Sequence, residues 1–146
     1  MIKKLLLIAL LAVIAYCYWP RHPDLLAYQP REMAALQTEA LQQAAGKQWF
    51  AHGVTYFKIY TGQYGIPPLA AVGTALDTTR AVSLYRSSTD QDDKAEAVKP
   101  LTAAYESIKK ETGKSYDPKT VAELEIKILA LVQEGAGNDV VAGKIA

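Results

Sequence analysis

The longest uninterrupted run of apolar residues lies at the N-terminus of the chain. Leu5 to Ala15 contains no charged or polar side chain, and four further residues carry the run to Trp19. As a helix, these fifteen residues span about 22 Å, which is short for a hydrocarbon core of about 30 Å. Lys3 and Lys4 precede the run, and lysine side chains reach toward the headgroups and lengthen such a span. The pattern predicts a transmembrane signal anchor over residues 1–19, which contacts the lipid bilayer.

The residues that flank this run predict its orientation. Lys3 and Lys4 favour a cytoplasmic N-terminus, and the aromatic residues that end the run suit the opposite interface. We therefore expect a single-pass membrane protein whose C-terminal domain lies in the periplasm or another exterior compartment. Two alternatives stay open. One is a signal peptide cleaved after Ala15, and the other is lipidation of Cys17, although Tyr16 stands where lipoprotein signals carry a small residue.

Beyond the apolar run, the spacing of apolar residues changes to steps of three and four. Residues 20–30 come first and contain three prolines, which disfavour helix in the preceding residues and predict an extended linker. A long helix is then predicted over residues 31–60. Gly46 and Gly53 lie inside it and indicate either the close approach of a neighbouring helix or a break. The glycines and prolines of residues 62–68 end it.

Three further helices follow from the same spacing. The second is predicted over residues 68–86, with these residues facing inward: Leu69, Val72, Leu76, Thr79 and Val82. The third contains Pro100, so it either bends there or begins nearby, and its inward residues are Val98, Leu101, Tyr105 and Ile108. The fourth begins with Asp117 as N-cap and Pro118 in the first turn, ends at Gly135, and carries the seam Val121, Leu124, Ile128 and Leu131.

No segment shows the two-residue alternation of a strand, so the predicted fold class is all-α. Four amphipathic helices with short connections favour a small antiparallel bundle. The predicted organisation is therefore a transmembrane helix over residues 1–19, a linker over residues 20–30, a helical bundle domain over residues 31–135, and a flexible tail over residues 136–146.

Composition excludes several classes of function. The net charge is +1, so no overall field attracts nucleic acid. A single cysteine, Cys17, rules out an internal disulfide and a CxxC-type zinc site. His22 and His52 have no second ligand at a suitable spacing, and the serines lack a nucleophile motif. We therefore expect a protein that is not an enzyme and that carries neither cofactor nor metal.

The aromatic residues suggest binding instead. Nine Tyr and two Trp stand against two Phe, and Tyr and Trp are the rings that protein interfaces favour. The candidate interaction surface comprises Tyr60, Tyr64, Arg80 and Arg86. The hypothesis is a non-enzymatic membrane-anchored accessory or assembly subunit that binds another membrane protein complex. The alternative is a periplasmic helical protein that binds a small hydrophobic ligand in a cavity lined by residues such as Trp49, Tyr56 and Tyr105.

Overall fold

The computed structural model describes residues 13, 15, 29–88 and 91–133, and the account below concerns these residues. The predicted anchor, except for residues 13 and 15, and the predicted tail over residues 136–146 lie outside the described part. Within that part, no helix is both long enough and apolar enough to cross a membrane.

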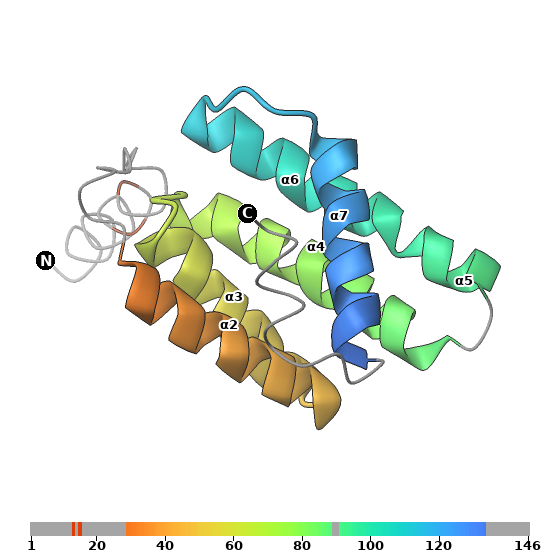
Figure 1. Ribbon diagram of the computed structural model, residues 1–146. Helices are drawn as coiled ribbons and strands as arrows, with labels where there is room; N and C mark the ends of the chain where they lie inside the picture. The colour runs from red at the N-terminus through yellow and green to blue at the C-terminus, as the bar shows by residue number, and fades with distance from the viewer. Residues whose placement is uncertain (1–12, 14, 16–28, 89–90, 134–146) are drawn as a thin grey trace, which may run out of the picture.

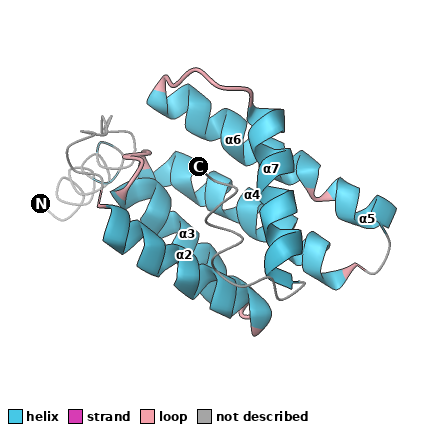
Figure 2. Ribbon diagram, in the orientation of Figure 1, coloured by secondary structure: helices cyan, strands magenta, loops and turns pink. Residues whose placement is uncertain are grey.

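The described residues form helices joined by short loops, and they contain no strand (Figure 2). The helices are α2 (Pro30–Ala45), α3 (Trp49–Gly62), α4 (Pro68–Ser87), α5 (Gln91–Glu96), α6 (Val98–Thr112) and α7 (Pro118–Gln133). The predicted all-α class is thus confirmed for this part of the chain. The six-residue α5 is an addition that the spacing of apolar residues did not predict.

Most of the helices lie side by side in one layer. In the order α2, α3, α4, α6, each helix contacts the next and runs in the opposite direction (Figure 1). The last helix, α7, does not join this layer but crosses in front of α4 and α6 in the view of Figure 1. Leu129 of α7 packs with Ala44, Val82 and Tyr85, so α7 bridges the layer from α2 to α4. The bundle is therefore antiparallel except for α7.

The long helix predicted over residues 31–60 is broken into α2 and α3. The break falls at Gly46, one of the two glycines at which the sequence left a break open, and Lys47 there adopts a left-handed φ of 56°. Glycine is a weak helix former, and a left-handed residue cannot continue a right-handed helix. Gly53 instead marks a close approach, because a Cβ at this position would lie 3.4 Å from the Thr79 hydroxyl oxygen of α4.

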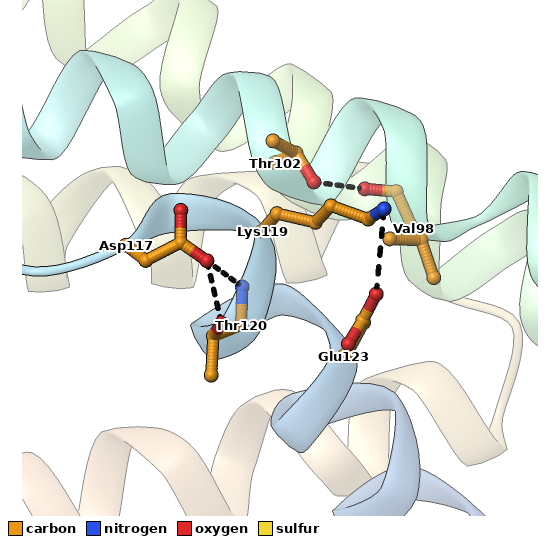
Figure 3. A network of polar contacts seen from close by, with 6 residues as sticks. All are labelled: Val98, Thr102, Asp117, Lys119, Thr120 and Glu123. Atoms are coloured by element: carbon orange, nitrogen blue, oxygen red, sulfur yellow. Dashed lines mark hydrogen bonds and ion pairs between the residues drawn. The ribbon is translucent and has the colours of Figure 1, made fainter.

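The predicted start of the last helix is confirmed. Asp117 precedes α7, and its carboxylate accepts a hydrogen bond from the Thr120 backbone N–H at 2.9 Å and another from the Thr120 hydroxyl (Figure 3). The first of these bonds satisfies a backbone N–H that a helix start leaves unpaired, and both bonds lower the pKa of Asp117. One turn further on, Lys119 and Glu123 form an exposed ion pair at 3.9 Å.

The other boundaries follow from the same local chemistry. Pro68 begins α4, and Gly113 ends α6 in a left-handed conformation with φ 67°, which glycine adopts without steric cost. Because α6 begins at Val98, Pro100 lies in its first turn, where no backbone hydrogen bond is lost. The predicted inward face of this helix is confirmed at Leu101 and Ile108, which are buried.

The predicted inward face of α4 is wrong over most of its length. Leu69, Val72 and Leu76 are exposed, and of the predicted set only Val82 is fully buried. Tyr85 is buried near Val82, but most of the interior side carries small residues instead, namely Ala71, Thr74, Ala75, Thr78 and Ala81. Their size lets α4 lie close to both α3 and α6, since a helix flanked on two sides packs closely only through short side chains.

The predicted seam of α7 is also wrong, by about one residue. Leu124 is 47% exposed, whereas Ala122 and Leu129 are buried. The other predicted members, Val121, Ile128 and Leu131, are only partly buried. The helix is rotated because Leu129 packs with the ends of α2 and α4, and Ala122 with Ala81 and Leu101.

Candidate functional site: an apolar groove and a partly buried tyrosine–carboxyl cluster

An open apolar groove of about 270 Å³ lies between α3 and α4. Its walls come from two helices, with Trp49, Phe50, Val54 and Phe57 on α3 and Val72 and Leu76 on α4. Its floor is made of the smaller residues Gly53, Ala75 and Thr79. We call this feature the α3/α4 groove.

The walls of the groove are exposed to solvent. Phe50 is 88% exposed and Leu76 is 63% exposed, and no described element covers either. At 100° per residue, Ile59 lies on the opposite side of α3 from Phe50, and Ile59 is fully buried in the core. The α3 helix therefore has an apolar side that faces the core and a second apolar side that faces outward.

The outward side continues along α4. Leu69 and Arg80 flank the groove residues of this helix at helical spacing, and both are exposed. Lys58, next to Phe57 on α3, is exposed as well. The groove thus has an apolar floor and apolar walls, with one cationic side chain at its edge on each helix. It can hold an apolar side chain or the apolar face of a helix, provided that the neighbouring residues of that partner are acidic or uncharged.

A second unusual feature is a column of buried and partly buried aromatic rings along α3. The column runs through Trp49, His52, Tyr56, Tyr60 and Tyr64, and neighbouring ring centroids lie 4.9 to 6.1 Å apart. These separations are typical of favourable aromatic pairs. The hydroxyl and imidazole groups need polar partners inside the protein, and α4 supplies two of them. The Thr79 hydroxyl lies 3.0 Å from His52 Nδ1, and Thr78 lies 2.7 Å from the Tyr60 hydroxyl.

Glu125 of α7 meets this column from the other side. Its carboxylate accepts a hydrogen bond from the Tyr105 hydroxyl and a longer one from the Tyr56 hydroxyl at 3.5 Å. The Tyr116 hydroxyl in turn donates to the Tyr105 carbonyl oxygen at 2.8 Å. Together these residues form the tyrosine–carboxyl cluster: Tyr56, Tyr60, Tyr105, Tyr116 and Glu125.

Burial governs the protonation of the cluster. Desolvation raises the pKa of Glu125 above its ordinary value, although the hydrogen bonds from Tyr105 and Tyr56 lower it in part. The pKa values of Tyr56, Tyr60 and Tyr105 are raised well above 10.0 by burial and by the nearby Glu125 charge. Burial raises the pKa of Tyr116 to about 12. The tyrosines are therefore neutral donors, and the cluster offers no activated nucleophile.

His52 stays neutral over the physiological range. Burial, together with the positive charge of Arg86, lowers its pKa to about 4. Among the described residues, no three side chains of His, Cys, Asp or Glu lie close enough together to hold a metal ion. His52 packs between aromatic rings and bonds to a threonine, so its role in this structure is to fix the contact between α3 and α4.

The four residues of the predicted interaction surface do not lie together on one surface. Tyr60 is 5% exposed, so its expected position on an exposed edge is wrong. Tyr64 is partly buried against the core that contains Ile59. Arg80 is exposed beside Leu76, whereas Arg86 is partly buried and lies near His52. Arg80 and Arg86 are six residues apart, which places them about 120° apart around the α4 axis.

Of the residues expected to line a cavity, only Trp49 lines the groove. Tyr56 and Tyr105 belong to the tyrosine–carboxyl cluster instead. The sequence did contain a signal for the groove. α4 has two patterned faces, because small residues also recur at steps of three and four, namely Ala71, Thr74, Ala75, Thr78 and Ala81. The pattern of large apolar residues predicts the other face, which the structure places outward.

Comparison of the chain with known proteins finds no family model, no curated protein and no solved structure that matches it.

Replacing Glu125 by glutamine should make stability less dependent on pH. A carboxyl group whose folded pKa is raised stabilises the fold most when protonated, so its contribution is lost as pH rises from about 4.5 through the raised value. Glutamine keeps an acceptor for Tyr105 and has no charge to bury. We expect Glu125→Gln to gain stability relative to the parent over this window, by about 1.4 kcal/mol for each unit of raised pKa.

Urea unfolding at a series of pH values, followed by far-UV circular dichroism, measures this difference. His52 titrates in both proteins, and its lowered pKa costs stability as pH falls from 6.5 toward about 4. That effect cancels in the comparison between variant and parent. A difference in stability that does not change with pH would show that Glu125 is not desolvated.

Proposed function

We propose that this chain is a non-enzymatic, membrane-anchored accessory or assembly subunit, and that its α3/α4 groove binds an apolar helix of another membrane protein. One observation carries the proposal: in the N-terminal half of α4, Leu69, Val72 and Leu76 are exposed, while alanine and threonine residues fill the interior side there. A helix that only had to pack inside its own domain would bury the larger residues. Contiguous exposed apolar surface of this kind marks a binding site.

The shape and the edge of the groove support a helix as the occupant. The groove runs between two antiparallel helices, and amphipathic helices bind in such grooves through residues at steps of three and four. Lys58 and Arg80 stand at its edges, so we expect acidic or uncharged residues where the bound helix meets them. Aromatic and leucine side chains such as Phe50 and Leu76 supply the apolar contact.

The anchor supports a partner that lies in the membrane. In this proposal, residues 1–19 span the bilayer with the N-terminus in the cytoplasm, and the helical domain lies in the periplasm or another exterior compartment. Nine residues separate Trp19 from Gln29, and a chain of that length reaches no more than about 36 Å. The domain then stays close to the bilayer, within reach of the membrane-facing parts of other proteins.

A second candidate function is the binding of a small hydrophobic ligand. The apolar lining of the groove favours it, but the volume of about 270 Å³ lies just below the range of roughly 300–1,000 Å³ that ligand pockets occupy. The groove is also open along its length. Native mass spectrometry of the purified protein distinguishes the two functions, since a tightly bound small molecule adds a constant mass to the monomer.

A pair of matched serine variants tests the proposed function. Leu76 lies in the groove and Leu124 lies on α7, and both are exposed, at 63% and 47%. Because exposed positions contribute little to stability, each substitution should change the free energy of unfolding by less than about 1 kcal/mol. After crosslinking in native membranes and purification in mild detergent, we expect a stoichiometric partner with the parent and with Leu124→Ser, and its loss with Leu76→Ser. Equal retention of the partner by both variants would refute the assignment of the groove.

A further inference from the structure

We propose that the helix bound in the α3/α4 groove carries two acidic residues about six positions apart, one on each side of its apolar face. This inference rests on the proposed function and adds to it the charge and the sequence spacing of the partner. The groove supplies the apolar contact, and Lys58 and Arg80 at its edges favour a carboxylate on each side of the bound helix.

The charged groups nearest the groove are cationic. The residues that line it carry no charge, and α3 contains no acidic residue. On α4, Arg80 is exposed and lies about 40° around the helix axis from Leu76, whereas Asp77 lies about 100° from Leu76 in the same direction. On α3, Lys58 is exposed and follows the groove residue Phe57. On both walls, the charge nearest the groove is therefore positive.

Both cations are available to a partner. Neither Lys58 nor Arg80 belongs to an ion pair among the described residues. The carboxylate of Glu39 on the neighbouring helix α2 instead accepts hydrogen bonds from Gln43 at 2.8 Å and from Thr55 at 3.4 Å. The two cations can therefore pair with carboxylates of a bound helix, and ion pairs at such an edge mainly decide which partner is accepted.

The two cations lie at different heights along the groove. Thr79 of α4 marks the register, because its hydroxyl oxygen lies 3.0 Å from His52 Nδ1 and would lie 3.4 Å from a Cβ at Gly53. Since α3 and α4 run in opposite directions, Arg80 is level with about residue 52 of α3 (Figure 1). Lys58 lies about six residues further along α3, which corresponds to about 9 Å.

The periodicity of a bound helix matches this offset. Its residues i and i+6 are about 9 Å apart along the axis and about 120° apart around it. When the residues at i−1, i+3 and i+7 face the floor of the groove, one of the pair points toward each wall. The right-handed turn of the helix places residue i on the α3 side and residue i+6 on the α4 side, as Lys58 and Arg80 require. Because the two walls are antiparallel, turning the bound helix end for end leaves this spacing unchanged.

A second copy of the chain does not supply these carboxylates. Two grooves placed face to face present uncharged linings and cationic edges to each other, and like charges across an interface oppose association. The occupant that complements the groove is therefore a helix of another protein with acidic residues beside its apolar face.

Three synthetic amphipathic peptides of about 18 residues test this inference with the purified full chain in mild detergent. All three share one apolar face. The first has glutamate at positions i and i+6, the second has lysine there, and the third has glutamine there and two glutamates on its opposite face. Fluorescence anisotropy of the labelled peptides gives each Kd. We expect the first peptide to bind at least about tenfold more tightly than the second, and at least about threefold more tightly than the third, which has the same net charge.

A charge reversal in the protein provides the complementary measurement. The double variant Lys58→Glu and Arg80→Glu should bind the second peptide more tightly than the first. The double variant Lys110→Glu and Lys127→Glu changes the net charge equally at exposed positions of α6 and α7, and it is the matched control. It should keep the order of the parent protein.

Equal Kd values for the first and second peptides, or for the first and third, would overturn the acidic pair. So would a reversed order in the control variant. In each of these cases the proposed function stands if Leu76→Ser weakens the binding of the peptides, because they then occupy the groove. If no peptide binds, or if the protein is a dimer that the first peptide does not dissociate, both the acidic pair and the proposed function are overturned.

Discussion

Replacing Tyr60 by alanine is expected to lower the free energy of unfolding by about 3–5 kcal/mol, the cost of removing a large aromatic ring from a packed core. Tyr60 is 5% exposed and lies in the middle of the aromatic column, between the rings of Tyr56 and Tyr64. Its hydroxyl bonds to Thr78, and the Thr78 hydroxyl donates its own hydrogen to the Thr74 carbonyl oxygen at 3.0 Å. Tyr60 is therefore the donor to Thr78.

The matched variant Tyr60→Phe keeps the ring and removes only that donor. Since Thr78 retains its bond to Thr74, the loss should be about 0.5–1.5 kcal/mol, the usual net value of one hydrogen bond. Urea unfolding followed by far-UV circular dichroism gives both values. If Tyr60→Ala costs less than about 1 kcal/mol, Tyr60 lies at the surface, as the sequence suggested, and the described core is wrong.

The second large effect concerns the orientation of α7. Leu129→Ala should cost about 2–5 kcal/mol, because Leu129 is buried among Ala44, Val82 and Tyr85. The same substitution at Leu124, five residues earlier on the same helix and 47% exposed, should cost less than about 1 kcal/mol. Helix propensity changes equally in the two variants, so the difference between them reports packing alone.

If urea unfolding shows instead that Leu124→Ala is the more destabilising of the two variants, the buried face of α7 is the one predicted from the sequence, namely Val121, Leu124, Ile128 and Leu131. That result would also remove the basis for placing Glu125 inside the protein, since a rotation of α7 that buries Leu124 turns its neighbour Glu125 outward.

The sequence predicted those features that depend on neighbouring residues. Asp117 and Pro118 mark the start of α7 because an N-cap and a first-turn proline act within one turn. The end of α6 follows from Gly113, which adopts a left-handed φ. The face of α6 could be predicted as well, because Leu101 and Ile108 are its large apolar residues and its other faces are polar.

Features that depend on contacts between distant helices were not predictable in the same way. On α4, the large apolar residues and the small residues both recur at helical spacing, and its contacts with α3 and α6 decide which side faces inward. Glu125 looks like any glutamate of a solvated helix until Tyr56 and Tyr105, 69 and 20 residues away, are placed beside it. The sequence places Tyr60 at a surface because tyrosine occurs both at interfaces and in cores. Whether a tyrosine is buried depends on contacts between helices, which the sequence pattern does not show.

The central claim is that the α3/α4 groove is covered in the membrane assembly, and thiol labelling in native membranes tests it most directly. In a Cys17→Ser background, Val72→Cys places a thiol in the groove wall and Leu124→Cys places one on α7, and both positions are 47% exposed. Both are treated with a membrane-impermeant maleimide that reaches the compartment of the helical domain. The account predicts that Val72→Cys reacts at least about tenfold more slowly than Leu124→Cys, because a bound helix excludes water and reagent, and that both react alike after denaturation. Equal rates in the intact membranes would contradict it.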